Sequence, residues 1–219
     1  MRKVILFTLL GLASLAQASP MSKSDVEQLV QKLQALHQSQ PSFEANFKEE
    51  RHTALLKDPL VSQGKIWFTV PDKVRREVNG SRPSTTIIDG NKMSIYYPSF
   101  QQLEVYDLAK KPMLRDSLQA IAAGFNFEKV TAFYNIEGSK EGNGYHLILT
   151  PKTASMRRLM RSVDLEVDQN LSPSQVQVQD AKGEKILVNY SNVRRGSVPE
   201  SMFQFTPPAG TTVTTPLGS

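Results

Sequence analysis

Residues 64–106 alternate apolar and polar side chains in four successive runs that are separated by turn residues. Successive side chains of a strand point to opposite faces of a sheet, so a period of two predicts strands that are buried on one face. Asp-Gly between two alternating runs favours a tight hairpin turn. The runs cover residues 66–70, 74–78, 93–97 and 102–105, and turn-forming residues lie between them. Pro71-Asp72 follows the first run, residues 80–83 and Asp89-Gly90-Asn91 lie between the second and the third, and Pro98-Ser99 precedes the fourth. We therefore expect an antiparallel meander of four strands with one continuous apolar face.

Strands are also expected on both sides of this meander. Residues 42–51 alternate before it, with Phe43, Ala45 and Phe47 on one side of the strand. After it, residues 163–168 alternate very regularly, and further runs bring the expected number of strands to about ten or eleven. So many strands in one sheet tend to curl, which favours an antiparallel β-barrel that does not close.

Two segments have helical periodicity instead. Residues 24–38 repeat apolar side chains at helical spacing, and Ser24 with Glu27 matches the capping box of a helix N-terminus. Residues 110–124 form a second apolar stripe, with Pro112 suited to its first turn. An apolar helix between two groups of strands is expected to lie across the apolar face of the sheet. The predicted fold is mainly β with α: an unclosed antiparallel β-barrel with helices over its mouth, in a single domain over residues 19–219.

The first eighteen residues have the composition of a signal peptide. Arg2 and Lys3 precede an apolar stretch over residues 4–15, and Ala16-Gln17-Ala18 forms a small-x-small cleavage site. The apolar stretch is shorter than the ~20 residues of a membrane-spanning helix, although an uncleaved anchor is the alternative. The chain has no cysteine, which excludes disulfides, thiolate chemistry and the lipid anchor of bacterial lipoproteins. We expect a signal peptide over residues 1–18 and a soluble periplasmic protein.

Charge and motifs argue against nucleic-acid binding and catalysis. Removing Arg2 and Lys3 lowers the formal net charge from +5 to +3, which is too small to indicate a nucleic-acid partner. His37, His52 and His146 have no metal-ligand spacing. Phosphate-binding loops, dinucleotide-binding motifs and nucleophile elbows are all absent from the sequence. We therefore expect no enzymatic activity, no catalytic residue, no metal and no cofactor.

Two basic clusters allow more than one interpretation. Arg157, Arg158 and Arg161 form the first, and Arg194 with Arg195 forms the second. Such clusters can bind lipid headgroups or an acidic patch on a partner, but most charged residues of this kind simply form a solvated surface.

Five short motifs occur in order along the mature chain. They are Ser42-Phe43-x-Ala45-x-Phe47, Gly64-Lys65-Ile66-Trp67-x-x-x-Pro71, Asp89-Gly90-x-x-x-x-x-Tyr96-x-Pro98, Leu149-Thr150-Pro151-Lys152 and Phe203-x-Phe205-Thr206-Pro207-Pro208-x-Gly210-x-x-Val213. With these motifs the chain resembles the LolA family of periplasmic carriers of outer-membrane lipoproteins. The resemblance implies an unclosed antiparallel β-barrel with a helical lid over an apolar cavity that takes acyl chains.

The resemblance also implies partners. These are an acylated lipoprotein as cargo, an inner-membrane ABC complex that releases it, and an outer-membrane acceptor. The carrier itself is expected to bind no nucleotide and to be a monomer. A carrier of another lipid or glycolipid for a different exporter is the alternative function, and a lipid-sensing regulatory domain of the same fold is a third.

Apolar residues of the strands and of the second helix are expected to form the lipid site. The residues expected to line the cavity are Phe47, Ile66, Phe68, Val70, Val74, Met93, Ile95, Leu103, Val105, Leu147, Leu149 and Leu165. Those expected in the lid are Met113, Leu114, Leu118, Ile121 and Phe125. Such a cavity can hold acyl chains because each CH₂ group removed from water contributes ~0.8 kcal/mol. The alternative interpretation is an ordinary core beneath two helices.

One position departs from the family pattern. Where the family usually has an arginine that hydrogen-bonds the lid, just before the proline of the second motif, this chain has Val70. Alternation places Arg76 on the same face as Val74 and Val78, where an apolar side chain would be expected. Because an unpaired buried guanidinium is costly, we expect Arg76 to find a carboxylate or carbonyl partner, and we hypothesise that it bonds the lid. Alternatively, Arg76 lies at the cavity rim and extends to water.

Overall fold

The computed structural model describes residues 18–110, 127 and 130–216. Its strands are β1 (Ser19–Pro20), β2 (Ser42–His52), β3 (Leu60–Thr69), β4 (Lys73–Asn79), β5 (Ser84–Asp89), β6 (Lys92–Tyr97), β7 (Gln102–Asp107), β8 (Tyr134–Glu141), β9 (Gly144–Pro151), β10 (Met160–Val167), β11 (Pro173–Asp180), β12 (Lys185–Arg195) and β13 (Thr212–Thr214). The helices are α1 (Lys23–Ser39), α3 (Val130–Phe133) and α4 (Ala154–Arg157), with 3₁₀ turns η1 (Pro98–Phe100), η2 (Leu108–Lys110) and η3 (Glu200–Phe203).

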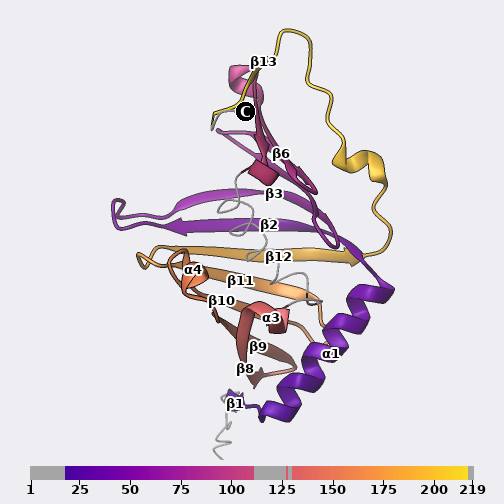
Figure 1. Ribbon diagram of the computed structural model, residues 1–219, viewed down its shortest axis with the longest axis vertical. Helices are drawn as coiled ribbons and strands as arrows, with labels where there is room; N and C mark the ends of the chain where they lie inside the picture. The colour runs from indigo at the N-terminus through magenta and orange to yellow at the C-terminus, as the bar shows by residue number, and fades with distance from the viewer. Residues whose placement is uncertain (1–17, 111–126, 128–129, 217–219) are drawn as a thin grey trace, which may run out of the picture.

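The described strands form one sheet in the order β1-β8-β9-β10-β11-β12-β2-β3-β4-β5-β6-β7-β13 (Figure 1). Neighbouring strands are antiparallel, except that β13 runs parallel to β7. Because β1 and β13 stand at opposite ends of this order, the sheet does not close. The predicted class, a mainly β fold built on an unclosed antiparallel sheet, is confirmed.

α1 begins at Lys23, and its N-cap is Ser22 rather than the predicted Ser24. The Ser22 hydroxyl accepts a hydrogen bond from the backbone N–H of Asp25 at 3.2 Å and donates one to the Asp25 carboxylate at 2.7 Å. The carboxylate also lies in the first turn, where the helix dipole favours negative charge. The sequence offers a serine and an acidic residue at this spacing twice, and the helix uses the first pair.

The sheet has thirteen strands among the described residues, more than the sequence predicted. β5 is absent from the predicted strands because its adjacent Ile87 and Ile88 break the alternation: they point to opposite faces, and both faces are at least half-covered there. β3 is also longer than expected. It begins at Leu60 rather than near Gly64, so only residues 53–59 connect it to β2.

α1 packs against one face of the sheet, which we call the inner face (Figure 1). The register places Phe43 opposite Phe68 and Leu147 opposite Leu165, and directly paired residues share a face. These side chains form one buried cluster with the apolar stripe of α1, which consists of Val26, Leu29, Val30 and Leu33. Full burial of each such side chain contributes about 1.5–3 kcal/mol, so this cluster makes a large contribution to stability.

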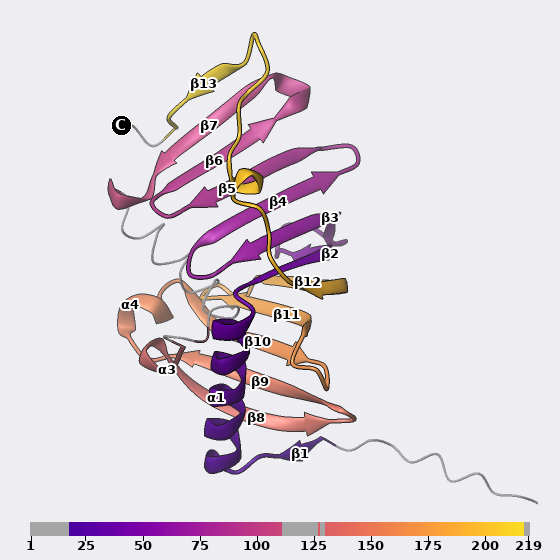
Figure 2. The same cartoon turned by 90° about the vertical axis from the view of Figure 1, so that its right-hand side faces the viewer.

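The C-terminal segment crosses β4, β5 and β6 before β13 joins the edge at β7 (Figure 2). The register places its contacts on the face opposite to α1, which we call the outer face. Arg75 donates from Nη1 to the carbonyl oxygen of Met202 at 3.0 Å, and the rings of Tyr96 and Phe205 have centroids 5.1 Å apart. Phe203 is buried in the same region. A second, smaller apolar layer therefore lies outside the sheet.

Leu103 and Val105 belong to this outer face, so the prediction that they continue the inner face is wrong. Tyr96 pairs with Leu103 and Ser94 with Val105, whereas Met93 and Ile95 point to the inner face. The connection over residues 98–101 has four residues, so odd-numbered residues of β6 pair with even-numbered residues of β7. The meander consequently has no single continuous apolar face across all its strands.

Candidate functional site

The inner face has a tightly packed part beneath α1. The hollow lined by Leu33, Phe43 and Phe127 has a volume of about 10 Å³, which is about the space that one water molecule needs. Six of the residues predicted to line a cavity lie in the buried cluster: Phe47, Ile66, Phe68, Leu147, Leu149 and Leu165. In the described part of the chain, these side chains form a filled core.

The inner face of β4, β5 and β6 is more open. Val74 and Val78 on β4, Ile88 on β5 and Ile95 on β6 are half-buried apolar side chains, and Met93 beside them is buried. Paired positions in the register connect them into one surface. Val70 is half-buried at the end of β3 and packs against the core cluster. Among the described residues, this surface is one part of the inner face where apolar side chains stay partly exposed.

The residues predicted for the lid lie outside the described residues: Met113, Leu114, Leu118, Ile121 and Phe125. Phe127, which follows them, is described and is held against α1. Its ring lies 5.7 Å from the ring of His37, centroid to centroid, and its carbonyl oxygen accepts a hydrogen bond from Gln34 Nε2 at 2.9 Å.

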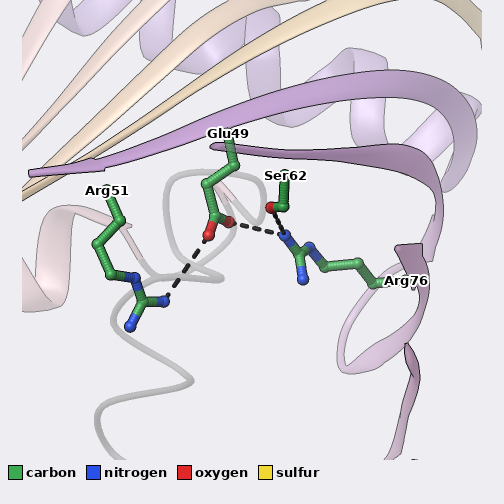
Figure 3. A network of polar contacts seen from close by, with 4 residues as sticks. All are labelled: Glu49, Arg51, Ser62 and Arg76. Atoms are coloured by element: carbon green, nitrogen blue, oxygen red, sulfur yellow. Dashed lines mark hydrogen bonds and ion pairs between the residues drawn. The ribbon is translucent and has the colours of Figure 1, made fainter. Parts of the chain in front are cut away.

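Arg76 points to the inner face and is paired there. Its Nη2 donates to Glu49 Oε2 at 2.9 Å and to Ser62 Oγ at 3.3 Å (Figure 3). Its guanidinium carbon lies 4.3 Å from the centroid of the Phe47 ring, which is a cation–π distance. Arg51 Nη2 approaches the other Glu49 oxygen at 3.7 Å. The expected carboxylate partner of Arg76 is confirmed, and the bond to the lid stays a prediction.

Two tyrosines on the inner face remain protonated at neutral pH. Burial raises the pKa of Tyr190, while the charge of Arg76 lowers it and that of Glu49 raises it. Burial also raises the pKa of Tyr106 to about 12, and its hydrogen bond to Glu104, at 2.8 Å, acts in the same direction. Both hydroxyls are therefore neutral polar groups on the inner face.

A groove of about 400 Å³ opens beside the Arg76 pair. It lies between the ends of β3 and β4, and its charged lining residues are Glu49, Arg51 and Arg82.

Among the described residues no cluster of three or more metal-ligating side chains occurs. No described helix combines the length and the apolar character needed to cross a membrane.

A family model described as "Outer membrane lipoprotein carrier protein LolA" matches residues 38–206. The chain belongs to the LolA family. The match begins at the end of α1 and includes every strand from β2 to β12, so the LolA family assignment covers the inner face described above. The family predicted from the five motifs is thereby confirmed.

Individual LolA relatives are distant in sequence. A protein named "Outer-membrane lipoprotein carrier protein" from Chromohalobacter salexigens is 23% identical over 184 residues, which cover 84% of this chain and 85% of that protein. One of the same name from Dechloromonas aromatica is 27% identical over 161 residues, covering 71% and 72%. The crystal structure of an uncharacterized conserved protein from Thermus thermophilus superposes with a TM-score of 0.53 at 12% identity, covering 87% of this chain and 99% of that one. This last likeness shows the fold alone.

Sequence reasoning missed Glu49 and Ile88 as inner-face residues. Glu49 continues the odd-numbered series of Phe43, Ala45 and Phe47 along β2, so the alternation itself places it on the inner face. Residues 49–62 are mostly polar, which is more typical of a strand end and a loop than of two paired strands. The charge of Arg76 was the signal that a carboxylate had to lie nearby.

Replacing Glu49 by glutamine is expected to lower the free energy of unfolding by about 1–2 kcal/mol, because a partly buried Arg76 then loses a charge-assisted hydrogen bond. Urea unfolding followed by circular dichroism measures this change. Glu50→Gln is the matched control, since the neighbouring Glu50 points outward and bonds Lys48 at the surface. Equal unfolding midpoints for the two variants would show that the Arg76 pair has no stabilising role.

Proposed function

We propose that the chain is a periplasmic carrier that shields the acyl chains of lipoproteins on their way to the outer membrane. Residues 1–18 serve as the signal peptide, and residues 19–219 form the single carrier domain. The observation that carries the proposal is the open apolar surface of Val74, Val78, Ile88 and Ile95 in a chain of the LolA family. The names of the two curated relatives support the same cargo.

The energetics of such a carrier follow from apolar burial. Each CH₂ group of an acyl chain that leaves water contributes ~0.8 kcal/mol, so a few acyl chains give strong binding without any specific polar contact. Met93 borders the apolar surface, and a flexible methionine side chain adapts to chains of different shape. Transfer of the cargo needs no covalent step, and therefore no catalytic group.

The partners follow from the route of the cargo. An inner-membrane ABC complex hands the lipoprotein to the carrier, and an acceptor at the outer membrane receives it. Hydrolysis of nucleotide occurs at the donor complex, and the carrier moves between the membranes as a monomer.

A carrier of another lipid or glycolipid is the second candidate. The observation that favours it is the charge at the groove: Arg51 and Arg82 line it together with Glu49, and Arg76 binds that carboxylate from the side. Arginine side chains bind phosphate and carboxylate groups through paired hydrogen bonds, so this end of the inner face suits an anionic headgroup.

Native mass spectrometry of the protein purified from its own periplasm separates the two candidates. We expect adducts whose masses correspond to acylated lipoproteins, and these should disappear when the cargo is stripped with detergent. Adducts with the masses of phospholipids or glycolipids alone would support the second candidate. Protein that carries no lipid, and that takes up neither class of lipid in vitro, would contradict both.

A further inference from the structure

The loop that joins β2 to β3, together with the first residues of β3, carries exposed aliphatic side chains. Leu55 has 90% of its surface exposed, and Leu56, Leu60 and Val61 have 48%, 47% and 57%. The β2–β3 hairpin also forms the leftmost point of the molecule in Figure 1. We call residues 53–61 the hairpin tip. Its apolar side chains are therefore about half or more exposed to water.

Basic side chains lie across a groove from the hairpin tip. A groove of about 480 Å³ separates it from the turn between β11 and β12, and Lys182 and Lys185 line that groove. Arg161 donates from Nε and Nη2 to the carbonyl oxygen of Ala181, which brings the α4–β10 region against the same turn. Arg158, three residues before Arg161, is exposed.

The charge of this end of the molecule is strongly biased. The hairpin tip, residues 154–161 and residues 180–185 together contain six basic residues and three acidic ones. Of the acidic side chains, Asp180 is occupied within its turn, where it accepts the backbone N–H groups of Lys182 and Glu184. These three segments therefore present net positive charge beside an exposed apolar tip.

We propose that the hairpin tip docks on the surface of an anionic lipid bilayer. Leu55 and Leu56 enter the boundary between headgroups and acyl chains, while Lys57, Lys182 and Lys185 contact the headgroups. Aliphatic side chains flanked by basic residues are what interfacial membrane contacts need. A protein partner is less well matched, because residues 51–62 contain no Trp, Tyr or Phe, the residues that anchor most protein interfaces. The docking does not depend on what the inner face carries.

Sedimentation with vesicles tests the docking on protein stripped of lipid. The wild-type protein should bind vesicles that contain phosphatidylglycerol more tightly than vesicles of phosphatidylcholine alone, and high salt should weaken the binding. The double variant Leu55→Ser/Leu56→Ser should bind about tenfold more weakly, because two apolar side chains no longer enter the interface. Val213→Ser is the matched control, since Val213 is also exposed but lies on β13, and it should bind like the wild type.

A fluorescent label reports the contact directly. The chain has no cysteine, so Leu55→Cys gives a single site for an environment-sensitive dye. Its emission should shift to the blue with anionic vesicles, whereas the same dye at Val213→Cys should not respond. Binding that is equal for neutral vesicles, or unchanged in the double variant, would overturn the proposal. So would a wild-type dimer that the double variant abolishes, since the tip would then contact a second copy of the chain.

Discussion

Replacing Gly64 by alanine is expected to lower the free energy of unfolding by about 3 kcal/mol. Gly64 lies in β3 between Phe47 on β2 and Val78 on β4. A Cβ atom at this position would lie 1.7 Å from the carbonyl oxygen of Glu77 and 3.2 Å from the Phe47 ring. Because the first of these atoms belongs to the backbone of β4, the clash can be relieved only if the two strands separate. Gly64 is thus required by a close approach of two strands in the middle of the sheet.

Urea unfolding of Gly64→Ala measures this effect, and Gly196→Ala provides the control. Gly196 has no atom within 4 Å of the corresponding Cβ position, and its φ is not in the left-handed region. The control should therefore unfold at the wild-type midpoint, whereas Gly64→Ala should unfold at much lower urea. A Gly64→Ala protein as stable as the control would mean that β3 and β4 adjust at no cost.

Replacing Ile95 by glutamate is expected to weaken cargo binding about a hundredfold or more. Ile95 is half-buried on the open apolar surface and pairs with Glu104 on β7. A second carboxylate there would have to be desolvated against acyl chains and would also repel Glu104. Titration of a fluorescent triacylated lipopeptide into the protein gives the dissociation constant.

Val105→Glu is the matched control for this experiment. Val105 has a similar burial and lies on the neighbouring strand, but the register turns it to the outer face. It should bind the lipopeptide with an affinity within about threefold of the wild type, provided that both variants melt near the wild-type temperature. If Val105→Glu weakened binding as much as Ile95→Glu, the cargo would not be confined to the inner face.

Local patterns predicted much of the fold, and the failures have physical causes. Strict alternation identified β2 and β10 because each strand has one buried face. Alternation did not identify β5, because the C-terminal segment covers its outer side. Strands that are covered on both faces lose the period of two. Which residues of β6 and β7 share a face depends on the length of the connection between the two strands. This length sets the register, but the hydrophobic pattern of the strands does not report it.

The candidate site was only partly accessible to sequence reasoning. Alternation correctly placed Arg76 on the inner face, where a partly buried guanidinium needs a hydrogen-bond partner. Which carboxylate pairs with Arg76 depends on how β2, β3 and β4 align. This alignment is a property of the assembled sheet. The distinction between Leu165, in the filled core, and Ile95, on the open surface, likewise depends on where α1 lies.

The two outermost strands have a consequence for behaviour at high concentration. A sheet that does not close leaves unpaired amide and carbonyl groups along its borders, and these can recruit strands from other molecules into fibres. Here β1 is two residues long and β13 is three, so each offers only a few such groups of its own and covers part of the edge of β8 or β7. Pro20 removes one donor from the first of these borders. The two short terminal strands are thus poor templates for strands of other molecules, and they shorten the free edges of the longer β8 and β7 behind them.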